Sequence, residues 1–185
     1  MELNDKKVIR AWCLYDWANS VYSLVITSTI FPVYYNSVTS KNGTDIVDFF
    51  GFHLPNTVLY SYSLSFSFLV IALILPLLSG IADYSGKKKM FMRFFTTLGS
   101  IACIGLFFFN GENVEYGIIC AVLASIGYSG ALVFYNSFLP EIATYDKYDR
   151  ISAQGFSYGY VGSVLLLIFN LLMIEQPGWF GLEPP

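Results

Sequence analysis

The chain has 185 residues, of which 55% are apolar, 18% are aromatic and 12% are charged, with a formal net charge of −3. This apolar content is higher than that of ordinary soluble domains, so the composition predicts a membrane protein. The acidic balance argues against a nucleic-acid partner.

Five apolar runs are each long enough to cross roughly 30 Å of hydrocarbon as a helix, at about 1.5 Å rise per residue. They are residues 12–35, 58–82, 90–109, 116–139 and 155–174. The predicted fold class is therefore an all-α membrane protein, a helical bundle of five transmembrane spans. The longest polar stretch, residues 36–56, is predicted to be a loop with little fixed structure.

The first run carries polar residues on one helical face. Asp16, Asn19, Ser20 and Ser23 are spaced at i, i+3, i+4 and i+7. Polar groups within a membrane are costly, so this face is expected to look into the bundle or a wet cavity. Asp16 and Asn19 are therefore candidates to line a substrate pathway. The alternative is that Asp16 lies near the membrane surface, where water or Arg10 satisfies it.

The second run admits two interpretations. Residues 59–68 alternate polar with apolar, as strands of a membrane barrel do. The run continues through residues 69–75 without alternation, which favours a helix. On that helix, serines four residues apart are expected to pack or to bond their own backbone: Ser61 with Ser65, and Ser63 with Ser67.

A charged turn, Ala82-Asp83-Tyr84-Ser85-Gly86-Lys87-Lys88, follows the second run. Gly86 can take the left-handed conformation that a turn requires. The Asp83 carboxylate can interact favourably with a helix N-terminus or with a nearby arginine. We interpret Asp83 as a conformational latch. Lys87, Lys88 and Lys89 are interpreted mainly as anchors that hold the turn in the cytoplasm.

The last two runs supply further candidates for the substrate pathway. Tyr135 and Asn136 lie near the end of the fourth run, and Gln154 and Tyr158 lie near the start of the fifth. Aromatic residues at span ends are also typical interface anchors, so that alternative stays open for the tyrosines. Between the two runs, Glu141, Asp146 and Arg150 predict either an exposed ion-pair network or a gate latch acting with Asp83.

The fifth run also has small residues on one face. Gly155, Gly159 and Gly162 are spaced four and then three residues apart, which allows another helix backbone to approach closely. We interpret this face as a packing surface.

Charge distribution predicts the topology. Nine of the 10 lysines and arginines fall in the segments that lie on one side if the N-terminus is cytoplasmic, and Lys41 is the exception. The opposite segments are acidic and contain Asp45, Asp48, Glu112, Glu115, Glu175 and Glu183.

Cysteine and histidine use gives no sign of catalysis. Cys13, Cys103 and Cys120 lie within or at the edge of apolar runs, and His53 is the only histidine. Their spacing does not suit a zinc site or a Cys-His nucleophile. No metal, cofactor or enzymatic activity is expected.

Four stretches resemble a known family. The turn at residues 82–88 is similar to the loop signature between the second and third spans of the major facilitator superfamily, although Ser79 stands where that signature has glycine. Residues 11–23, 134–143 and 150–162 resemble the autophagy-related vacuolar effluxer-like branch of that superfamily.

The resemblance implies a secondary active transporter that moves a small polar solute, such as an amino acid, by alternating access. Its partners would be the lipid bilayer, a small-molecule substrate and a coupling proton, and Tyr22 in the first matched stretch becomes a pathway candidate. The implied location is a bacterial inner membrane, with a cytoplasmic N-terminus. Such transporters have two facing six-span halves, so we expect transport to need a sixth span and a second half. The alternative function is a membrane adaptor that binds other helices through the glycine face of residues 155–162.

Overall fold

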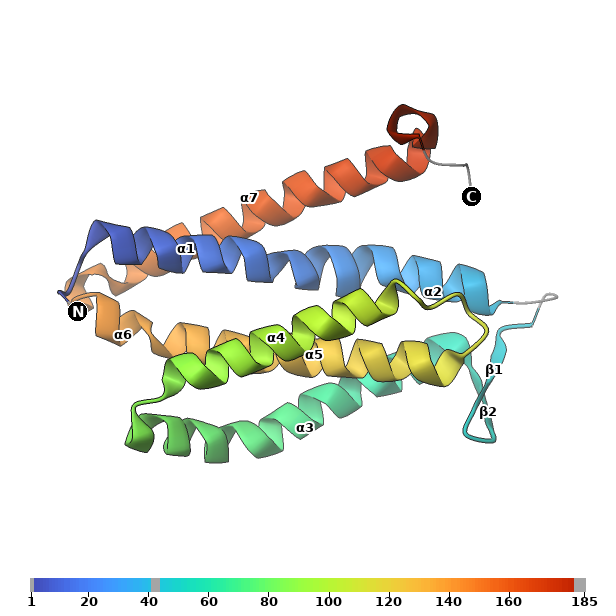
Figure 1. Ribbon diagram of the computed structural model, residues 1–185, viewed down its shortest axis with the longest axis horizontal. Helices are drawn as coiled ribbons and strands as arrows, with labels where there is room; N and C mark the ends of the chain where they lie inside the picture. Colours follow the sequence, from blue (N-terminus) through green and yellow to red (C-terminus); the bar gives the residue numbers. More distant parts are fainter. Residues whose placement is uncertain (1, 41–43, 182–185) are drawn as a thin grey trace. The chain divides into compact units, whose positions relative to one another are not determined.

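The computed structural model describes residues 2–40 and 44–181. Lys41 and Glu183, which entered the charge analysis, lie outside the described residues. The chain forms two compact units, one of residues 1–31 with 139–185 and the other of residues 32–138. They are called unit 1 and unit 2, and each is described by itself (Figure 1).

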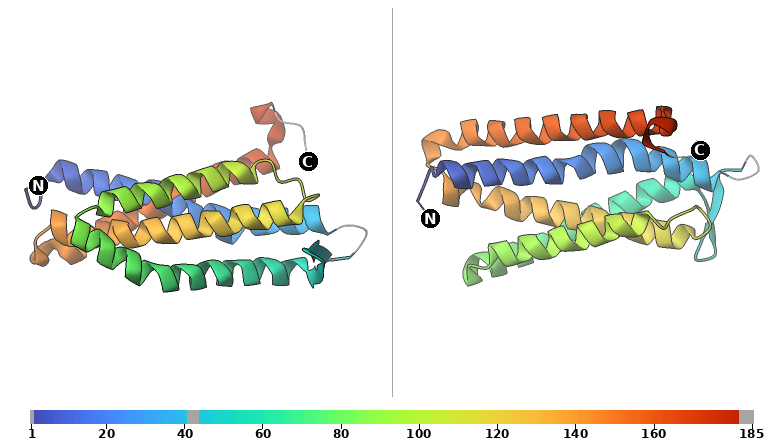
Figure 2. Two further views of the ribbon diagram at one scale, coloured as in Figure 1. Left: turned by 60° about the horizontal axis from the view of Figure 1, so that its bottom comes forward. Right: turned by 45° about the horizontal axis from the view of Figure 1, so that its top comes forward.

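Unit 1 is built on two long helical segments. Its elements are α1 (Lys6–Val21), the π-helix η1 (Tyr22–Ile30), α6 (Leu139–Ile142), the 3-10 helix η2 (Tyr145–Lys147), α7 (Tyr148–Glu175) and the 3-10 helix η3 (Pro177–Phe180). The Asp5 side chain caps α1 by accepting a hydrogen bond of 2.8 Å from the Lys7 N–H. Helices α1 and α7 lie side by side in both views of Figure 2.

Glycines explain the close approach of these two helices. Gly155, Gly159 and Gly162 are buried on one face of α7. A Cβ atom at Gly162 would overlap the Trp17 ring, and one at Gly159 would press on the Ser20 hydroxyl. The predicted close packing at this glycine face is confirmed, and its partner is α1.

Unit 2 is a bundle in which α5 packs against both α3 and α4. Its elements are α2 (Phe31–Thr39, from Pro32 onward), β1 (Ile46–Phe49), β2 (Phe52–Pro55), α3 (Asn56–Ser85), α4 (Lys88–Leu106) and α5 (Val114–Ser137). The alternating stretch 59–68 is therefore helical, as predicted.

Aromatic rings and small residues fill the core of unit 2. Phe134 stacks on Phe91 and Phe95, with ring centroids 5.4 Å and 5.9 Å apart. Gly130 leaves room for the Phe95 ring. Ser67 is fully buried and donates to the Ser63 carbonyl at 2.8 Å, which confirms the predicted bonding of these serines to their own backbone.

Four helices of the described residues are long and apolar enough to cross a membrane: Asn56–Ser85, Lys88–Leu106, Val114–Ile142 and Tyr145–Glu175. The first predicted span, residues 12–35, is helical too. It is divided among α1, η1 and α2, which have 16, 9 and 9 residues, so no single piece reaches the about 20 residues of a full crossing. The chain is thus an all-α, multi-pass membrane protein, with its first segment built differently from the other four.

The prediction of an unstructured loop at residues 36–56 was wrong. Helix α2 continues to Thr39, and β1 and β2 form an antiparallel hairpin with Val47 opposite Leu54 and Asp48 opposite His53. Phe50 and Gly51 form its two-residue turn with φ values of 50° and 85°, the left-handed pair typical of tight hairpins. Alternation of side chains along β1, with Val47 buried, is what fixes the register.

Candidate functional site

The predicted polar face of α1 contains a buried acid. Asp16 is only 3% exposed, and the Ser20 hydroxyl donates to its Oδ1 atom at 3.2 Å. On the α7 side, a Cβ atom at Gly159 would lie 3.2 Å from Asp16 Oδ2. The absence of a side chain at Gly159 therefore leaves room for the carboxyl group. A buried carboxylate is costly unless it is paired, so Asp16 is expected to have a functional role in addition to a packing role.

Asn19 lies on α1 three residues after Asp16. Its Nδ2 atom is buried and has no hydrogen-bond partner among the described residues. Buried polar groups are hydrogen-bonded in nearly all folded proteins, so an unpaired donor of this kind indicates a place for a ligand or a water molecule. Asp16 and Asn19 together present an acceptor and a donor within one helical turn.

The π-helix η1 begins immediately after this turn, at Tyr22. Ser28 and Thr29 donate to the carbonyls five residues before them, at Ser23 and Leu24, each at 2.7 Å. π-helical turns are rare and frequently mark functional sites. Spacing rules based on 3.6 residues per turn could not predict this element; the only signal in the sequence is a cluster of serine, threonine and β-branched residues.

The candidates on α7 occupy a different face from its glycines. Gln154 is exposed, and Tyr158 is 39% exposed. Tyr158 borders a hollow of about 390 Å³ whose lining, from α1 and α7, is almost wholly apolar and includes Leu14 and Trp17. The surroundings of Tyr158 thus suit apolar contact better than recognition of a polar solute.

Two further pathway candidates belong to unit 2. Tyr135 is 3% exposed within the core of α5, whereas its neighbour Asn136 is exposed. The structure therefore distributes the predicted pathway residues over both units, and it groups Asp16 and Asn19 within unit 1.

The predicted latch is a compact turn at one end of unit 2. Gly86 ends α3 with φ of 65°, which confirms the predicted left-handed conformation. Lys88 Nζ lies 2.9 Å from Asp83 Oδ1. Lys88 is 19% exposed and Asp83 62% exposed, so Lys88 is the more sheltered partner. Charge counting treated the three lysines as equivalent, but the structure distinguishes Lys88 from Lys87 and Lys89.

Glu141 and Arg150 lie in unit 1. Both are exposed, Glu141 on α6 and Arg150 in the first turns of α7. Near them, Asn4 donates to the Thr144 hydroxyl at 3.1 Å, and the Thr144 N–H donates to Asn4 Oδ1 at 3.2 Å. These two bonds connect the N-terminus to the turn before α7, a contact that sequence reasoning missed.

Residues 2–40 and 44–181 contain no group of three or more His, Cys, Asp or Glu side chains able to hold a metal ion. Cys13, Cys103 and Cys120 are free thiols. The chemistry that the Asp16 region offers is reversible binding: a carboxylate accepts or attracts positive charge, and the Asn19 amide donates.

Apolar membrane helices that enclose a buried acid and an unpaired amide define the class of multi-pass membrane proteins with a polar interior. The family of vacuole effluxer Atg22-like proteins matches residues 4–180, nearly the whole described chain. The chain belongs to this transporter family, which confirms the resemblance seen in the sequence.

Several relatives are similar over most of the chain. The Bacillus subtilis (strain 168) protein named "Uncharacterized MFS-type transporter YxiO" is 35% identical over 164 residues, which cover 89% of this chain and 37% of the relative. An uncharacterized protein of Aquifex aeolicus (strain VF5) is 27% identical, over 90% of this chain and 39% of the relative. "Autophagy-related protein 22" of Kluyveromyces lactis is 24% identical, over 92% of this chain and 41% of the relative.

The chain thus spans about two fifths of the length of these relatives. No solved structure gives a significant match.

Proposed function

We propose that this chain forms the N-terminal part of a secondary active transporter that moves a small polar solute, with amino acids as the substrate class, by alternating access. Membership of the Atg22-like family and similarity to an MFS-type transporter support the general activity. The observation that carries the proposed site is the buried Asp16 carboxyl beside the unpaired Asn19 amide.

The pairing suits a zwitterion. A carboxylate at Asp16 attracts the ammonium group of an amino acid, and the Asn19 amide donates to its carboxylate. Asp16 can also carry the coupling proton, because a neutral carboxyl is less costly in an apolar bundle than a charged one. Ser20 orients the carboxyl through its hydrogen bond to Oδ1.

In this proposal the first segment, residues 12–35, also crosses the membrane, which brings the number of spans to five, and the π-helix η1 lies within it. The N-terminus is cytoplasmic, because the lysines and arginines collect on that side. The proposed location is a bacterial inner membrane, which the similarity to a Bacillus subtilis transporter supports. A sixth span and a second half complete the pathway, and the two halves rock around the central site. The Asp83–Lys88 pair, with Glu141 and Arg150, stabilises one of the two states.

The adaptor alternative loses its basis. It depends on a free glycine face on α7, but α1 already occupies that face through Trp17 and Ser20. We therefore retain the transporter proposal alone.

Transport by the complete protein in proteoliposomes tests the site, with a panel of radiolabelled amino acids as probes. Asp16→Asn keeps the shape of the side chain but cannot ionise, so uptake or efflux should collapse or lose its pH dependence. Asn19→Ala should mainly raise the half-saturating solute concentration. Ser23→Ala, on the same face of the segment, is the matched control and should transport normally. Unchanged rate and pH profile in Asp16→Asn would remove Asp16 from the pathway.

A further inference from the structure

The β1–β2 hairpin of unit 2 has two chemically different faces. Side chains that alternate along a strand point to opposite faces, and residues paired across the hairpin share a face. One face carries Asp48 opposite His53, with Asp48 Oδ2 and His53 Nδ1 3.9 Å apart. The other carries Val47 opposite Leu54 and, nearer the turn, Phe49 opposite Phe52. The hairpin is therefore polar on one side near its turn and wholly apolar on the other.

The apolar face is only partly covered by the protein. Val47 is buried and β1 packs against α5, while β2 packs against α3. Toward the turn this cover ends, because Phe52 is 68% exposed and Phe50, at the tip, is 67% exposed. Phe49 and Phe50 contact each other with ring centroids 4.8 Å apart. The tip is thus a cluster of three phenylalanines that extends beyond the bundle.

The turn itself places a phenylalanine where the backbone disfavours it. Phe50 has φ of 50°, whereas the first position of such turns normally holds asparagine, aspartate or glycine. A bulky residue at positive φ is uncommon and is kept only where other contacts stabilise it. Its N–H donates to Glu115 Oε1 at 3.3 Å, and Asp48 Oδ1 accepts from the Gly51 N–H at 2.8 Å. These bonds hold the tip in place without covering its rings.

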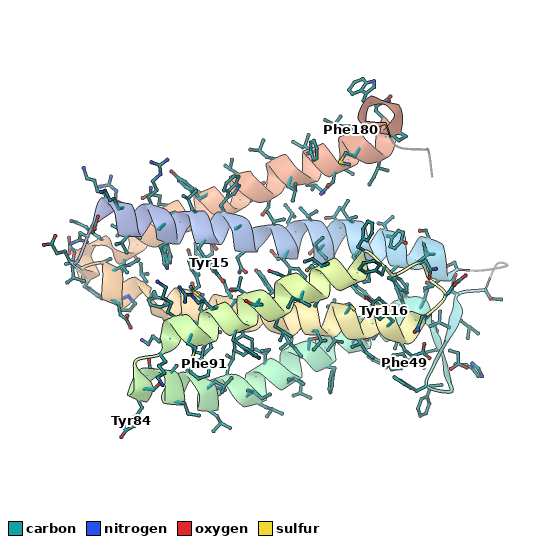
Figure 3. The ribbon with its side chains drawn as sticks, in the orientation of Figure 1. Tyr15, Phe49, Tyr84, Phe91, Tyr116 and Phe180 are labelled. Carbon is teal, nitrogen blue, oxygen red and sulfur yellow. The ribbon has the colours of Figure 1, made fainter. Side chains whose placement is uncertain are left out.

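The hairpin lies at the end of unit 2 and runs across the axes of the helices, as Figure 1 and the right view of Figure 2 show. Figure 3 places Phe49 at the same end of unit 2 as Tyr116 of α5. A strand pair oriented in this way lies along the plane of a membrane that the helices cross. Its junction with α3 is rigid, because Asn56 is fully buried and donates to Asn36 and Thr39 at 2.8 Å and 2.9 Å.

We propose that the phenylalanine tip of this hairpin is seated in the boundary between lipid headgroups and acyl chains, as a membrane-interface anchor of unit 2. Phe52 is four residues before α3 and is as exposed as Leu73 and Leu77 on the outward face of that helix, at 66% and 70%. The tip therefore continues the surface that the spanning helix presents to lipid. Phe107 and Phe108, directly after α4, are 85% and 69% exposed and add apolar side chains at the same end of unit 2.

Site-directed spin labelling tests the anchor. The chain, with its three cysteines replaced by serine, is reconstituted in vesicles of phosphatidylethanolamine and phosphatidylglycerol, and Phe52→Cys and His53→Cys each carry a nitroxide. These neighbours point to opposite faces of the hairpin, so His53→Cys is the matched control. The ratio of collisions with oxygen to collisions with a water-soluble nickel complex should be several-fold higher at position 52 than at position 53.

Three outcomes would overturn the proposal. Equal ratios at the two positions would mean that the faces are in the same environment, and free access of nickel to position 52 would mean that the tip is in water. A label at position 52 that neither oxygen nor nickel reaches would mean that another protein surface covers it. Phe52→Trp and His53→Trp, with the native cysteines kept, give a second readout: brominated lipid should quench the added fluorescence only at position 52.

Discussion

The two units solve the problem of helix packing in a membrane with different residues. In unit 2 the contacts are aromatic and apolar, as in the stack of Phe91, Phe134 and Phe95, and its buried serines bond to backbone carbonyls. In unit 1 the α1–α7 contact encloses Asp16 and lies beside the unpaired Asn19 amide. The buried Asn56 of unit 2 is hydrogen-bonded as well, whereas unit 1 keeps a costly buried acid and an amide without a partner among the described residues. That cost is expected where a protein binds a polar solute.

The largest effect is expected at the glycine face of unit 1. Gly162→Val adds a Cβ atom that overlaps the Trp17 ring, so α1 and α7 must separate. Overpacking of this kind typically costs about 1–3 kcal/mol of unfolding free energy. Thermal unfolding in detergent measures the loss. Gly80→Ala, with nothing within 4 Å of the added atom, is the control and should unfold at the parent temperature or above. If Gly162→Val is as stable as Gly80→Ala, α7 does not pack on α1 as described.

The next effect is expected at the hairpin junction of unit 2. Asn56→Leu removes the donor to Asn36 and Thr39 and leaves their oxygens with fewer partners. An unsatisfied buried polar group costs about 1–3 kcal/mol, so the variant should unfold earlier than the parent chain. Asn136→Leu, at an exposed position of unit 2, is the comparison and should change little.

The contrast between the units predicts an opposite sign at Asp16. Asp16→Asn replaces a buried acid by a neutral group of the same shape, so unfolding free energy should stay equal or rise by about 1 kcal/mol while transport is lost. Thermal unfolding and uptake are measured on the same preparation. A variant that loses stability and activity together would indicate a structural role for Asp16.

The smallest effect is expected at the turn between α3 and α4. Asp83 is mostly exposed, and exposed ion pairs are worth about 0.2–1 kcal/mol, so Lys88→Gln should scarcely alter stability. In the complete transporter it should slow transport, because the pair stabilises one state. Lys89→Gln retains the Asp83–Lys88 pair and is the matched control. Equal transport rates in the two variants would return all three lysines to the role of anchors.

The long apolar runs made most of the fold predictable. The runs at residues 58–82, 90–109 and 116–139 became α3, α4 and α5 with boundaries shifted by two or three residues, because twenty apolar residues in succession have few alternatives to a membrane helix. The hairpin was missed because its glycine and proline were taken as loop signals. The residue types from Ile46 to Phe49 do not alternate between apolar and polar, and only their burial in the structure does. No spacing rule could have predicted the π-helix η1 from the sequence.

Helical spacing predicted which side chains share a face of α1, while the role of these residues in a site stays a prediction. The i, i+3, i+4 pattern brought Asp16, Asn19 and Ser20 to one face of α1, and the structure places Ser20 on the Asp16 carboxyl. Helical spacing was less informative for Tyr158, because the apolar hollow beside this residue depends on which helix lies opposite. The pairing of Lys88 with Asp83 likewise depends on the path of the turn around Gly86, which charge counting ignores.

Access of water and solute to Asn19 tests the central claim most directly. In the complete protein without its native cysteines, Asn19→Cys keeps Asp16 and places a thiol beside it, and a small cationic thiol reagent reports its accessibility. The account predicts that Asn19→Cys reacts and that a transported amino acid slows the reaction, while Tyr145→Cys, at a position 87% exposed, reacts equally with or without that amino acid. Reaction at Asn19→Cys that no transported solute slows, or no reaction at all, would contradict a substrate site at this face of α1.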